Sequence, residues 1–373
     1  MISSTPASAS AQATQPAHAP APASAPADRP APALAPAPTP ADRPAPLAWR
    51  SPHGRAMPAG VDPAGPRTLV MAVLNLTPDS FSDGGQFHST QAVVDRAGAL
   101  LAEGADLLDV GGESTRPGHA PVGETGELAR VLPVIEALRK AFPAAPISID
   151  TYKAAVAQAA IRAGADIIND ILGGMSGVDA AVWRAWREAA RNHAAAPSAE
   201  RGAPLPETAV SAPPVSPMAR VMAGARCPVI LMHNRAPGRD YADFWPDMLL
   251  DLRASVAMAR AAGVAENQIW LDPGFGFAKD AAQNLEALKH LGRVVALGPP
   301  VLLATSRKST IGRVLDEPVP ARRDAGTAAT LVWGVQQGAR MVRVHDVAGT
   351  RPHLLMADAI RAGLSWRKAS PSV

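Results

Sequence analysis

Cysteine is almost absent from this chain, which has Cys227 as its single thiol among 373 residues. One cysteine excludes an internal disulfide and any metal cluster built on thiolates. Cys227 precedes Pro228 at the start of an apolar run, so we expect a buried structural thiol rather than a nucleophile. A chain without disulfides is typical of a reducing cytoplasm, where we expect this protein to act.

Aromatic side chains, long apolar runs and strong net charge are also lacking. Aromatic residues make up 4% of the chain and the net charge is +3, which argues against a base-stacking surface and a nucleic-acid partner. No apolar stretch approaches the roughly 20 residues of a membrane helix. The first residues lack the basic start and leucine-rich core of a secretory signal. We therefore expect a soluble protein with small-molecule substrates.

The 38 prolines are concentrated in part of the chain. Residues 1–65 alternate Ala and Pro with Ser and Thr, and the string Ala-Asp-Arg-Pro-Ala-Pro occurs twice, from Ala27 and from Ala41. Such a segment has few apolar side chains to bury and favours polyproline II, so it predicts a disordered tail. Residues 66–373 remain for one folded domain. A second low-complexity stretch at about residues 193–217 predicts a surface insertion within it.

Eight short β-rich runs alternate with eight longer helical patterns in this domain. The strand runs are apolar throughout, which is typical of parallel strands buried on both faces, and the pattern predicts an α/β fold, a (β/α)8 TIM barrel. A doubly wound open sheet is the alternative. We expect strands at Thr68–Leu74, Asp106–Val110, Ile147–Ile149, Asp166–Ile168, Val229–Met232, Ile269–Leu271, Val301–Ala304 and Met341–Val344. We expect helices at Gln91–Glu103, Glu127–Phe142, Ala154–Ala163, Asp179–Arg191, Asp243–Ala262, Ala281–Leu291, Arg323–Gly338 and Pro352–Ala362.

Polar residues follow each predicted strand. A single Asp or Asn at such a place often only caps the next helix. In a barrel, however, all strand carboxyl ends open on one face, where barrel active sites are built. Eight polar strand ends therefore predict an active site. In chain order they are Asn75, Asp109–Gly118, Asp150–Thr151, Asn169–Asp170, His233, Asp272–Phe277, Ser306–Ser309 and Arg343–Asp346.

One subset of these residues suits a planar ligand edge that donates hydrogen bonds. Asp150, Asn169 and Asp272 directly follow apolar strands, so they are expected deep in the mouth. Carboxylates there need a donor-rich partner, which the amino-pyrimidine edge of a pterin provides, and Lys308 can face a ring carbonyl or nitrogen. The alternative is a carboxylate–lysine ion pair that only stabilises the barrel.

A second subset suits a pyrophosphate. Asn75, Arg116, Arg343 and His345 combine guanidinium, imidazole and carboxamide groups, and barrels commonly hold phosphate near the last strands. No His-rich or Cys-rich cluster is visible. A Mg²⁺ carried by the pyrophosphate, with Asn75 as its only protein ligand, fits the habits of that ion. The alternatives are an Arg343 paired with a neighbouring acid and a His345 satisfied within the core.

A third subset lies in the loops after the first two strands. Phe81 stands among Ser, Asp and Gly residues, and Thr115, Arg116 and Pro117 lie between Glu113 and Gly118. Glycine-punctuated loops of this kind are suited to closing over a bound substrate. The alternative is a pair of ordinary turns.

At these residues the chain closely resembles the dihydropteroate synthases. The resemblance covers roughly Thr68 to Ala362, and its two long signatures are specific. They are Asn-Leu-Thr-Pro-Asp-Ser-Phe-Ser-Asp-Gly-Gly at Asn75–Gly85 and Asp-Val-Gly-Gly-Glu-Ser-Thr-Arg-Pro-Gly at Asp109–Gly118, followed by Ser148–Thr151, Ile168–Asp170, Met232–His233, Asp272–Phe277, Ser306–Ser309 and Arg343–Asp346.

The resemblance implies a role for each residue. It implies that this chain joins a pterin pyrophosphate to para-aminobenzoate as a homodimer, at a site that sulfonamides would also occupy. Asp150, Lys308, Arg343 and His345 would be catalytic. Asp150, Asn169, Asp272 and Lys308 would hold the pterin, with Met232 against its face; Asn75, Arg116, Arg343 and His345 would hold pyrophosphate and magnesium; Phe81, Thr115, Pro117, Phe277, Ser309 and the Lys308 stem would hold the arylamine.

Two residues depart from the family pattern, and two other functions stay open. Ala278 and Ala304 stand where the family usually has glycine, and Ala304 would add a methyl to the floor of the pterin pocket. A folate-using methyltransferase on a similar barrel would also bind a pterin edge with carboxylates. A catalytically silent relative that binds a partner protein is the other alternative. Both loop signatures, with Asn75, Phe81 and Arg116, favour the synthase.

Overall fold

The computed structural model describes residues 51–54, 67–76, 90–114, 120–194, 214–235 and 241–363, with side chains only to 192 in the fourth range. These residues belong to one compact unit. Most of the predicted tail and insertion lies outside them. None of the described helices is long and apolar enough to cross a bilayer.

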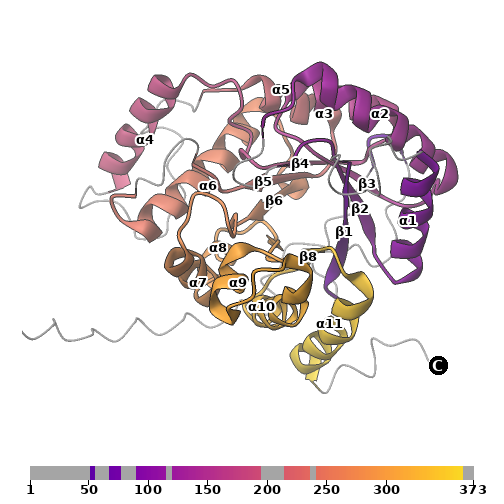
Figure 1. Cartoon of the computed structure of the whole chain (residues 1–373). Helices are drawn as coiled ribbons and strands as arrows, with labels where there is room; N and C mark the ends of the chain where they lie inside the picture. The colour runs from indigo at the N-terminus through magenta and orange to yellow at the C-terminus, as the bar shows by residue number, and fades with distance from the viewer. Residues whose placement is uncertain are drawn as a thin grey trace, which may run out of the picture. The chain divides into compact units, whose positions relative to one another are not determined.

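Eight parallel strands follow one another in sequence order around a nearly closed ring (Figure 1). β1 also pairs with β8, where Leu69 is opposite Met341, and a bridge between Leu271 and Val301 joins β6 to the start of β7. This sequential order confirms the TIM barrel and excludes the doubly wound sheet, whose strand order reverses. The strands are β1 (Leu69–Asn75), β2 (Leu107–Gly111), β3 (Ile147–Asp150), β4 (Ile167–Asp170), β5 (Val229–Met232), β6 (Ile269–Asp272), β7 (Leu302–Leu303) and β8 (Met341–Val344).

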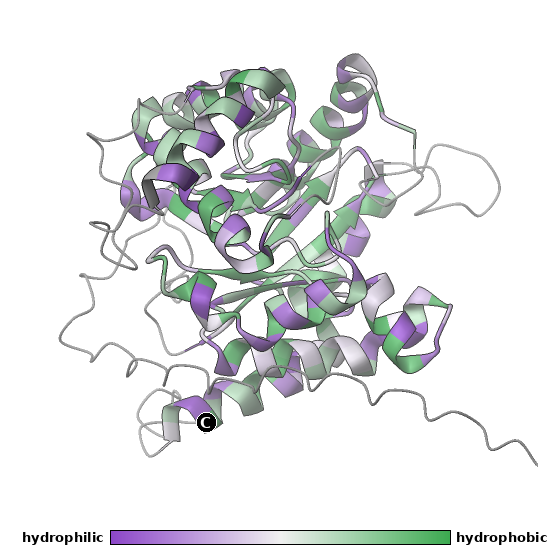
Figure 2. Ribbon diagram, turned by 90° about the vertical axis from the view of Figure 1, so that its left-hand side faces the viewer, coloured by the Kyte–Doolittle hydropathy of each residue, from purple (hydrophilic) through white to green (hydrophobic). Residues whose placement is uncertain are grey.

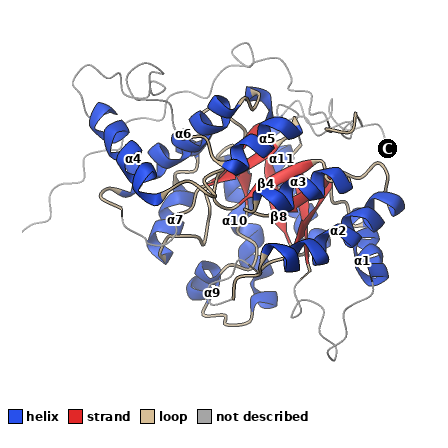
Figure 3. Cartoon of the chain, turned by 90° about the horizontal axis from the view of Figure 1, so that it is seen from above, coloured by secondary structure: helices blue, strands red, loops and turns tan. Residues whose placement is uncertain are grey.

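Helices surround the ring, as the view from above shows (Figure 3). Several begin at residues suited to cap them. Asp280 and Gln283 form a capping box on α7, and the Ser216 hydroxyl accepts the N–H of Ala219 in the first turn of α5. The helices are α1 (Thr90–Ala102), α2 (Glu124–Ala141), α3 (Ala154–Ala163), α4 (Ala180–Ala194), α5 (Pro217–Ala225), α6 (Phe244–Ala262), α7 (Ala281–Lys289), α8 (Gly292–Val295), α9 (Ser309–Leu315), α10 (Asp324–Gln336) and α11 (Val347–Ala362), with short 3-10 helices η3 (Glu266–Gln268) and η4 (Pro320–Arg323).

The core has two layers, one between strands and helices and one inside the ring. Apolar residues dominate the strands, whereas the helices alternate apolar and polar stretches (Figure 2). Fully buried side chains fill the ring, so it is a packed core rather than a pore. This inner layer consists of Leu69, Met71, Leu107, Ile167, Ile230, Trp270, Leu302 and Met341. Cys227 belongs to the outer layer, and burial raises the pKa of its thiol to about 12, as expected for a structural cysteine.

The fourth crossover differs from the prediction. We assigned Asp179–Arg191 as the barrel helix after the fourth strand. In the structure α5 packs between α3 and α6, so α5 holds that place in the helical layer, while α4 packs on α6. Hydrophobic periodicity shows that a helix has an apolar face, but it does not show which neighbour covers that face. The start of α5 at Pro217 also falls at the end of the predicted insertion.

Four residues of the predicted tail are described by the structure. Residues 51–54 lie within the predicted disordered segment, yet Ser51 is buried and its hydroxyl donates to Asp166 Oδ1 at 2.6 Å. The ring of His53 lies 3.1 Å from the carbonyl oxygen of Ala165. Both contacts are made just before β4, at the amino-terminal face of the barrel. Composition did not reveal them because they use one hydroxyl and one imidazole rather than apolar side chains.

Candidate active site

The carboxyl ends of the strands bring most of the predicted site residues to one mouth. Asn75, Asp150, Met232 and Asp272 are the last residues of β1, β3, β5 and β6. Asn169 is the penultimate residue of β4, and the register places it opposite Asp150. The same ring carries Arg343 and His345 at β8 and Lys308 at the start of α9.

Arg343 forms ion pairs with two acids at this mouth. Its Nε donates to Asp109 Oδ2 at 2.6 Å and its Nη2 donates to Asp150 Oδ2 at 2.7 Å. Burial opposes the charge on Arg343, but the two carboxylates raise its pKa above the ordinary value. We expected Arg343 in the pyrophosphate subset. The structure places it in contact with the pterin subset, in the ion pair that was the alternative.

Asp109 stood among the polar strand ends of the sequence but was given no role in binding or catalysis; it is fully buried in β2. Besides Arg343, it is approached by Asn169, whose Nδ2 lies 3.3 Å from Asp109 Oδ2. Asp109 therefore orients two residues that face the mouth. The signal was present in the sequence as one acid within the apolar run Leu-Leu-Asp-Val-Gly, where an unpaired carboxylate would be costly.

Asp150 has an oxygen available for a ligand. Its Oδ2 accepts from Arg343, whereas its buried Oδ1 has no hydrogen-bond partner among the residues that the structure describes. Burial raises the pKa of this carboxyl to about 7; Arg343 opposes that shift, and Asp109 adds to it. A buried acceptor without a donor is costly, so this atom favours a donor-bearing ligand.

The Asp272 carboxylate is held by the turn that follows it in the chain. Its Oδ1 accepts the amide of Gly274 at 2.7 Å, and burial raises the pKa of the carboxyl while Lys308 and Lys279 oppose the shift. Met232 lies opposite Asp272 in the sheet register and is buried. Gly274 (φ +65) has no room for a side chain, because a Cβ would lie 1.9 Å from the carbonyl oxygen of His233.

Lys308 and Phe277 contact each other at the loops that follow β6 and β7. Lys308 Nζ donates to the carbonyl oxygen of Phe275 at 2.9 Å and lies 4.0 Å from the centre of the Phe277 ring. This contact is close enough for a cation–π interaction. Ser309 is exposed beside them at the first turn of α9.

His345 is held by a serine of the neighbouring strand end. The Ser306 hydroxyl lies 2.9 Å from His345 Nδ1 and accepts the main-chain N–H of His345 at 3.2 Å. Between Ser306 and Lys308, Arg307 adopts a left-handed backbone (φ +60), and Asp324 binds its guanidinium through two bonds of 2.8 Å. This bidentate pair stabilises a conformation that arginine rarely adopts.

Asn75 is the described residue that we expected to bind magnesium. It is partly buried at the end of β1, and its Oδ1 lies 3.7 Å from the position a Cβ would take on Gly111. The described residues include no group of three or more His, Cys, Asp or Glu side chains suited to a metal ion. A single carboxamide oxygen suits Mg²⁺, because most ligands of this ion are water molecules and oxygens of the substrate phosphates.

The four loop residues Phe81, Thr115, Arg116 and Pro117 lie outside the described residues. The base of the second loop is described, and it contains an acid–base cluster. Lys153 forms ion pairs with Glu113 and with the buried Glu127, and the Tyr152 hydroxyl donates to Glu113 Oε1 at 3.1 Å. Glu113 thus anchors the segment that leads into the loop.

Of the two departures, Ala278 has a structural effect. Its backbone is left-handed (φ +46), a conformation that glycine adopts without steric cost. Ala304 follows β7 and is buried.

Chemically, the strand ends supply both buried hydrogen-bond acceptors and basic side chains. Asp150, Asn169 and Asp272 suit a planar donor edge, and Arg343, Lys308 and His345 suit developing negative charge. This arrangement fits binding and charge stabilisation.

Comparison with known proteins agrees with this chemistry. The model of the pterin binding enzyme family matches residues 71–196 and 211–345. The dihydropteroate synthase of Bacillus subtilis is 46% identical over 294 residues, covering 79% of this chain and 89% of the relative. A dihydropteroate synthase structure from Clostridium difficile, solved in the presence of pteroic acid, has a TM-score of 0.65 at 40% identity and covers 79% of this chain and 97% of that one. The Xanthomonas albilineans dihydropteroate synthase with 4-aminobenzoic acid has a TM-score of 0.67 at 36% identity, covering 84% and 99%.

Proposed function

Because the chain belongs to the dihydropteroate synthases within the pterin-binding enzymes, we propose that it condenses hydroxymethyl-dihydropterin pyrophosphate with para-aminobenzoate. The products are dihydropteroate and pyrophosphate, and the reaction belongs to folate biosynthesis. The relatives support a synthase over a folate-using methyltransferase.

The observation that carries this proposal is the buried Oδ1 of Asp150, opposite Asn169 in the sheet register, which has no hydrogen-bond partner among the described residues. A pterin has a planar edge of amino and ring N–H donors that these acceptors can bind. Met232 would pack against the ring face, and Lys308 would donate to a ring carbonyl or nitrogen. Binding would give Asp150 the donors it lacks, which favours its ionised form.

Pyrophosphate would be bound by Arg343 and His345 together with Arg116 from the second loop. Asn75 would supply the one protein oxygen to Mg²⁺. When bound, this ion neutralises charge on the leaving group. Because Arg343 also pairs with Asp150, it would connect the pterin and pyrophosphate subsites.

The arylamine would lie against Phe277, Ser309 and the apolar stem of Lys308, with Phe81, Thr115 and Pro117 closing over it. In the reaction the bond from the pterin methylene carbon to pyrophosphate breaks, and its electron pair leaves with pyrophosphate. The electron-rich pterin stabilises the cationic carbon, and the arylamine nitrogen attacks it and then loses a proton to pyrophosphate or water. The protein side chains bind and orient the two substrates and exclude water from the site. The reaction needs no protein nucleophile.

The direct test supplies both substrates and magnesium to the full chain and measures dihydropteroate by chromatography. The Asp150→Ala variant is the matched control and should lose most of the activity. Binding of both substrates by a folded wild type that forms no product would instead support the silent relative. A sulfonamide, which mimics the arylamine, should compete with para-aminobenzoate in the same assay.

We also propose that the protein is a homodimer. α10 and α11 pack on each other, and they expose Trp333, Leu355, Met356 and Ile360, the last at 64%. Such a group of apolar side chains on neighbouring helices is typical of an interface. Light scattering should give twice the chain mass for the wild type and a lower mass for Ile360→Asp; a monomeric wild type would contradict the proposal.

A further inference from the structure

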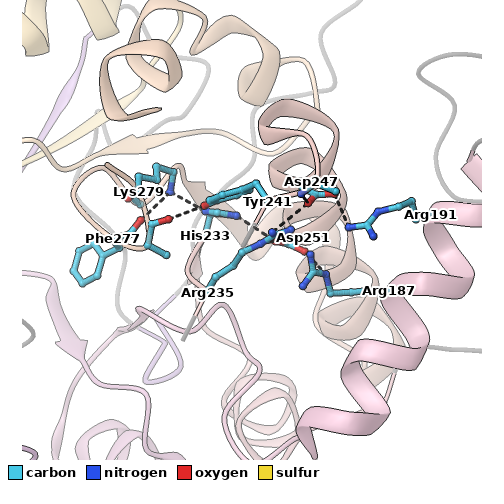
Figure 4. A network of polar contacts seen from close by, with 12 residues as sticks. Arg187, Arg191, His233, Arg235, Tyr241, Asp247, Asp251, Phe277 and Lys279 are labelled. Atoms are coloured by element: carbon cyan, nitrogen blue, oxygen red, sulfur yellow. Dashed lines mark hydrogen bonds and ion pairs between the residues drawn. The ribbon is translucent and has the colours of Figure 1, made fainter. Parts of the chain in front are cut away.

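Lys279 lies directly behind the turn that follows β6, and only 3% of it is exposed. Its Nζ lies 3.2 Å from the carbonyl oxygen of Gly274, 3.2 Å from that of Phe277 and 2.8 Å from His233 Nδ1. Burial lowers the pKa of Lys279 to about 7. In its ammonium form the group has three N–H donors, and these three acceptors use all of them. In Figure 4 the Phe277 ring points away from this contact, on the other side of the turn.

His233 connects Lys279 to the surrounding helices. With Lys279 as the donor to Nδ1, the ring proton is assigned to Nε2, which faces Asp251 Oδ2 on α6 at 3.4 Å. The same oxygen accepts from Arg235 Nε at 2.6 Å, and Arg187 of α4 lies 2.8 Å from the other oxygen of Asp251. Burial lowers the pKa of His233 to about 4, so its ring is neutral near pH 7 and can act as an acceptor. Lys279 is therefore linked through His233 to a buried network of charged side chains (Figure 4).

Two further side chains donate to carbonyl groups of the same turn and so restrain its backbone. Lys308 donates to the carbonyl oxygen of Phe275 at 2.9 Å, and the Tyr241 hydroxyl donates to that of Ala278 at 3.0 Å. With the two carbonyls bound by Lys279, four of the five carbonyl groups from Gly274 to Ala278 accept from a side chain. The turn is a fixed support for Phe277.

Lys279 lowers the pKa of the Asp272 carboxyl through its charge, but the Gly274 amide and Lys308 each lower that pKa more. The Asp272 carboxylate is fixed by the amide of Gly274 at 2.7 Å, and its backbone lies in the register of β6 with β5. Loss of Lys279 should therefore displace Phe277 while leaving Asp272 in place.

We propose that Lys279 is a positioning residue that fixes the Gly274–Ala278 turn and so sets the affinity for the arylamine. It acts through Phe277 and does not touch either substrate. The inference rests on the proposed function, because Phe277 matters to the arylamine only if that substrate binds beside it.

The test is Lys279→Met in the full chain, which keeps the length of the side chain and removes its three donors. Calorimetry gives the Kd of para-aminobenzoate in the presence of pterin and magnesium pyrophosphate, and separately the Kd of the pterin. We expect the arylamine Kd to rise about tenfold or more and the pterin Kd to change less than about threefold. Unchanged arylamine binding, or equal loss for both ligands, would overturn the inference.

Arg139→Met is the matched control. Arg139 also ties main-chain carbonyls, those of Ala145 at 2.9 Å and Gly164 at 2.9 Å, but at the opposite face of the barrel. This variant should lose stability and keep both Kd values. If Lys279→Met fails to fold, Tyr241→Phe decides instead, because it removes one bond to the same turn; wild-type arylamine affinity in Tyr241→Phe then overturns the inference. Wild-type turnover in parallel tests the proposed function itself, and the Kd comparison holds even where no product forms.

Discussion

Replacing Arg343 by Met should destabilise the barrel by an amount that depends on pH. Arg343 makes ion pairs of 2.6 and 2.7 Å with Asp109 and Asp150, and Asp109 is fully buried. Removing the cation leaves two carboxylates together in a buried site. Loss of one partner from a buried ion pair typically costs about 3–5 kcal/mol.

The sign of the pH dependence follows from Asp150. Its pKa is about 7 in the folded protein against an ordinary 3.8, so the folded state binds more protons between these values and stability falls as pH rises through them. Removing Arg343 raises the folded-state pKa further. Above pH 7 the free energy of unfolding of the wild type should no longer fall with pH. That of the variant should continue to fall, by at most about 1.4 kcal/mol per pH unit.

The assay is urea unfolding of wild type and variant at pH 5.5, 7 and 8.5, followed by circular dichroism. The gap between the two proteins should widen with pH. The double variant Asp150→Asn/Arg343→Met should recover about 2 kcal/mol at pH 8.5, because it removes the titrating charge. A gap that is constant with pH, or a double variant no more stable than the single one, would refute this account of the Arg343 cluster.

Four further outcomes are expected. Asp272→Ala should weaken pterin binding by about 2–5 kcal/mol, measured by calorimetry, and wild-type affinity would contradict its assignment to the pterin. His345→Ala should impair binding of the pterin pyrophosphate and spare the unphosphorylated hydroxymethyl pterin, whereas equal loss for both would indicate a structural role. Ala278→Gly should stabilise the protein by about 0.5–1 kcal/mol in urea unfolding because φ is +46 there, and no gain would show that neighbouring contacts compensate. Deleting residues 1–50 should leave the melting temperature unchanged, whereas a deletion that also removes Ser51 should lower it through loss of the bond to Asp166; equal melting temperatures would contradict this.

Most of the barrel could be predicted from the sequence because its strands are apolar throughout and end in polar residues. The ranges of β5, β8 and α3 agree with the prediction at both ends. The same logic led to Asp150, Asn169 and Asp272, because residues that end parallel strands must share one face.

What could not be predicted depends on contacts between distant residues. Periodicity did not distinguish α4 from the barrel helix α5, because both have an apolar face. The link between Lys279 and His233 joins residues 46 positions apart, and it exists only once two strand ends lie side by side. Arg343 was assigned to the pyrophosphate from its charge and its place on the last strand, and its pairing with Asp109 requires closure of β8 onto β1.

That closure also has a consequence for synthesis. β1 pairs with β8, and Thr68 is bound through its amide and hydroxyl to Asp358, 290 residues further along the chain. While the nascent chain is growing, β1 has β2 on one side and an unpaired edge on the other. Exposed strand edges invite pairing with other chains. The ring can close only when Met341–Val344 has left the ribosome, so the last strand made is the one that ends the exposure of the first.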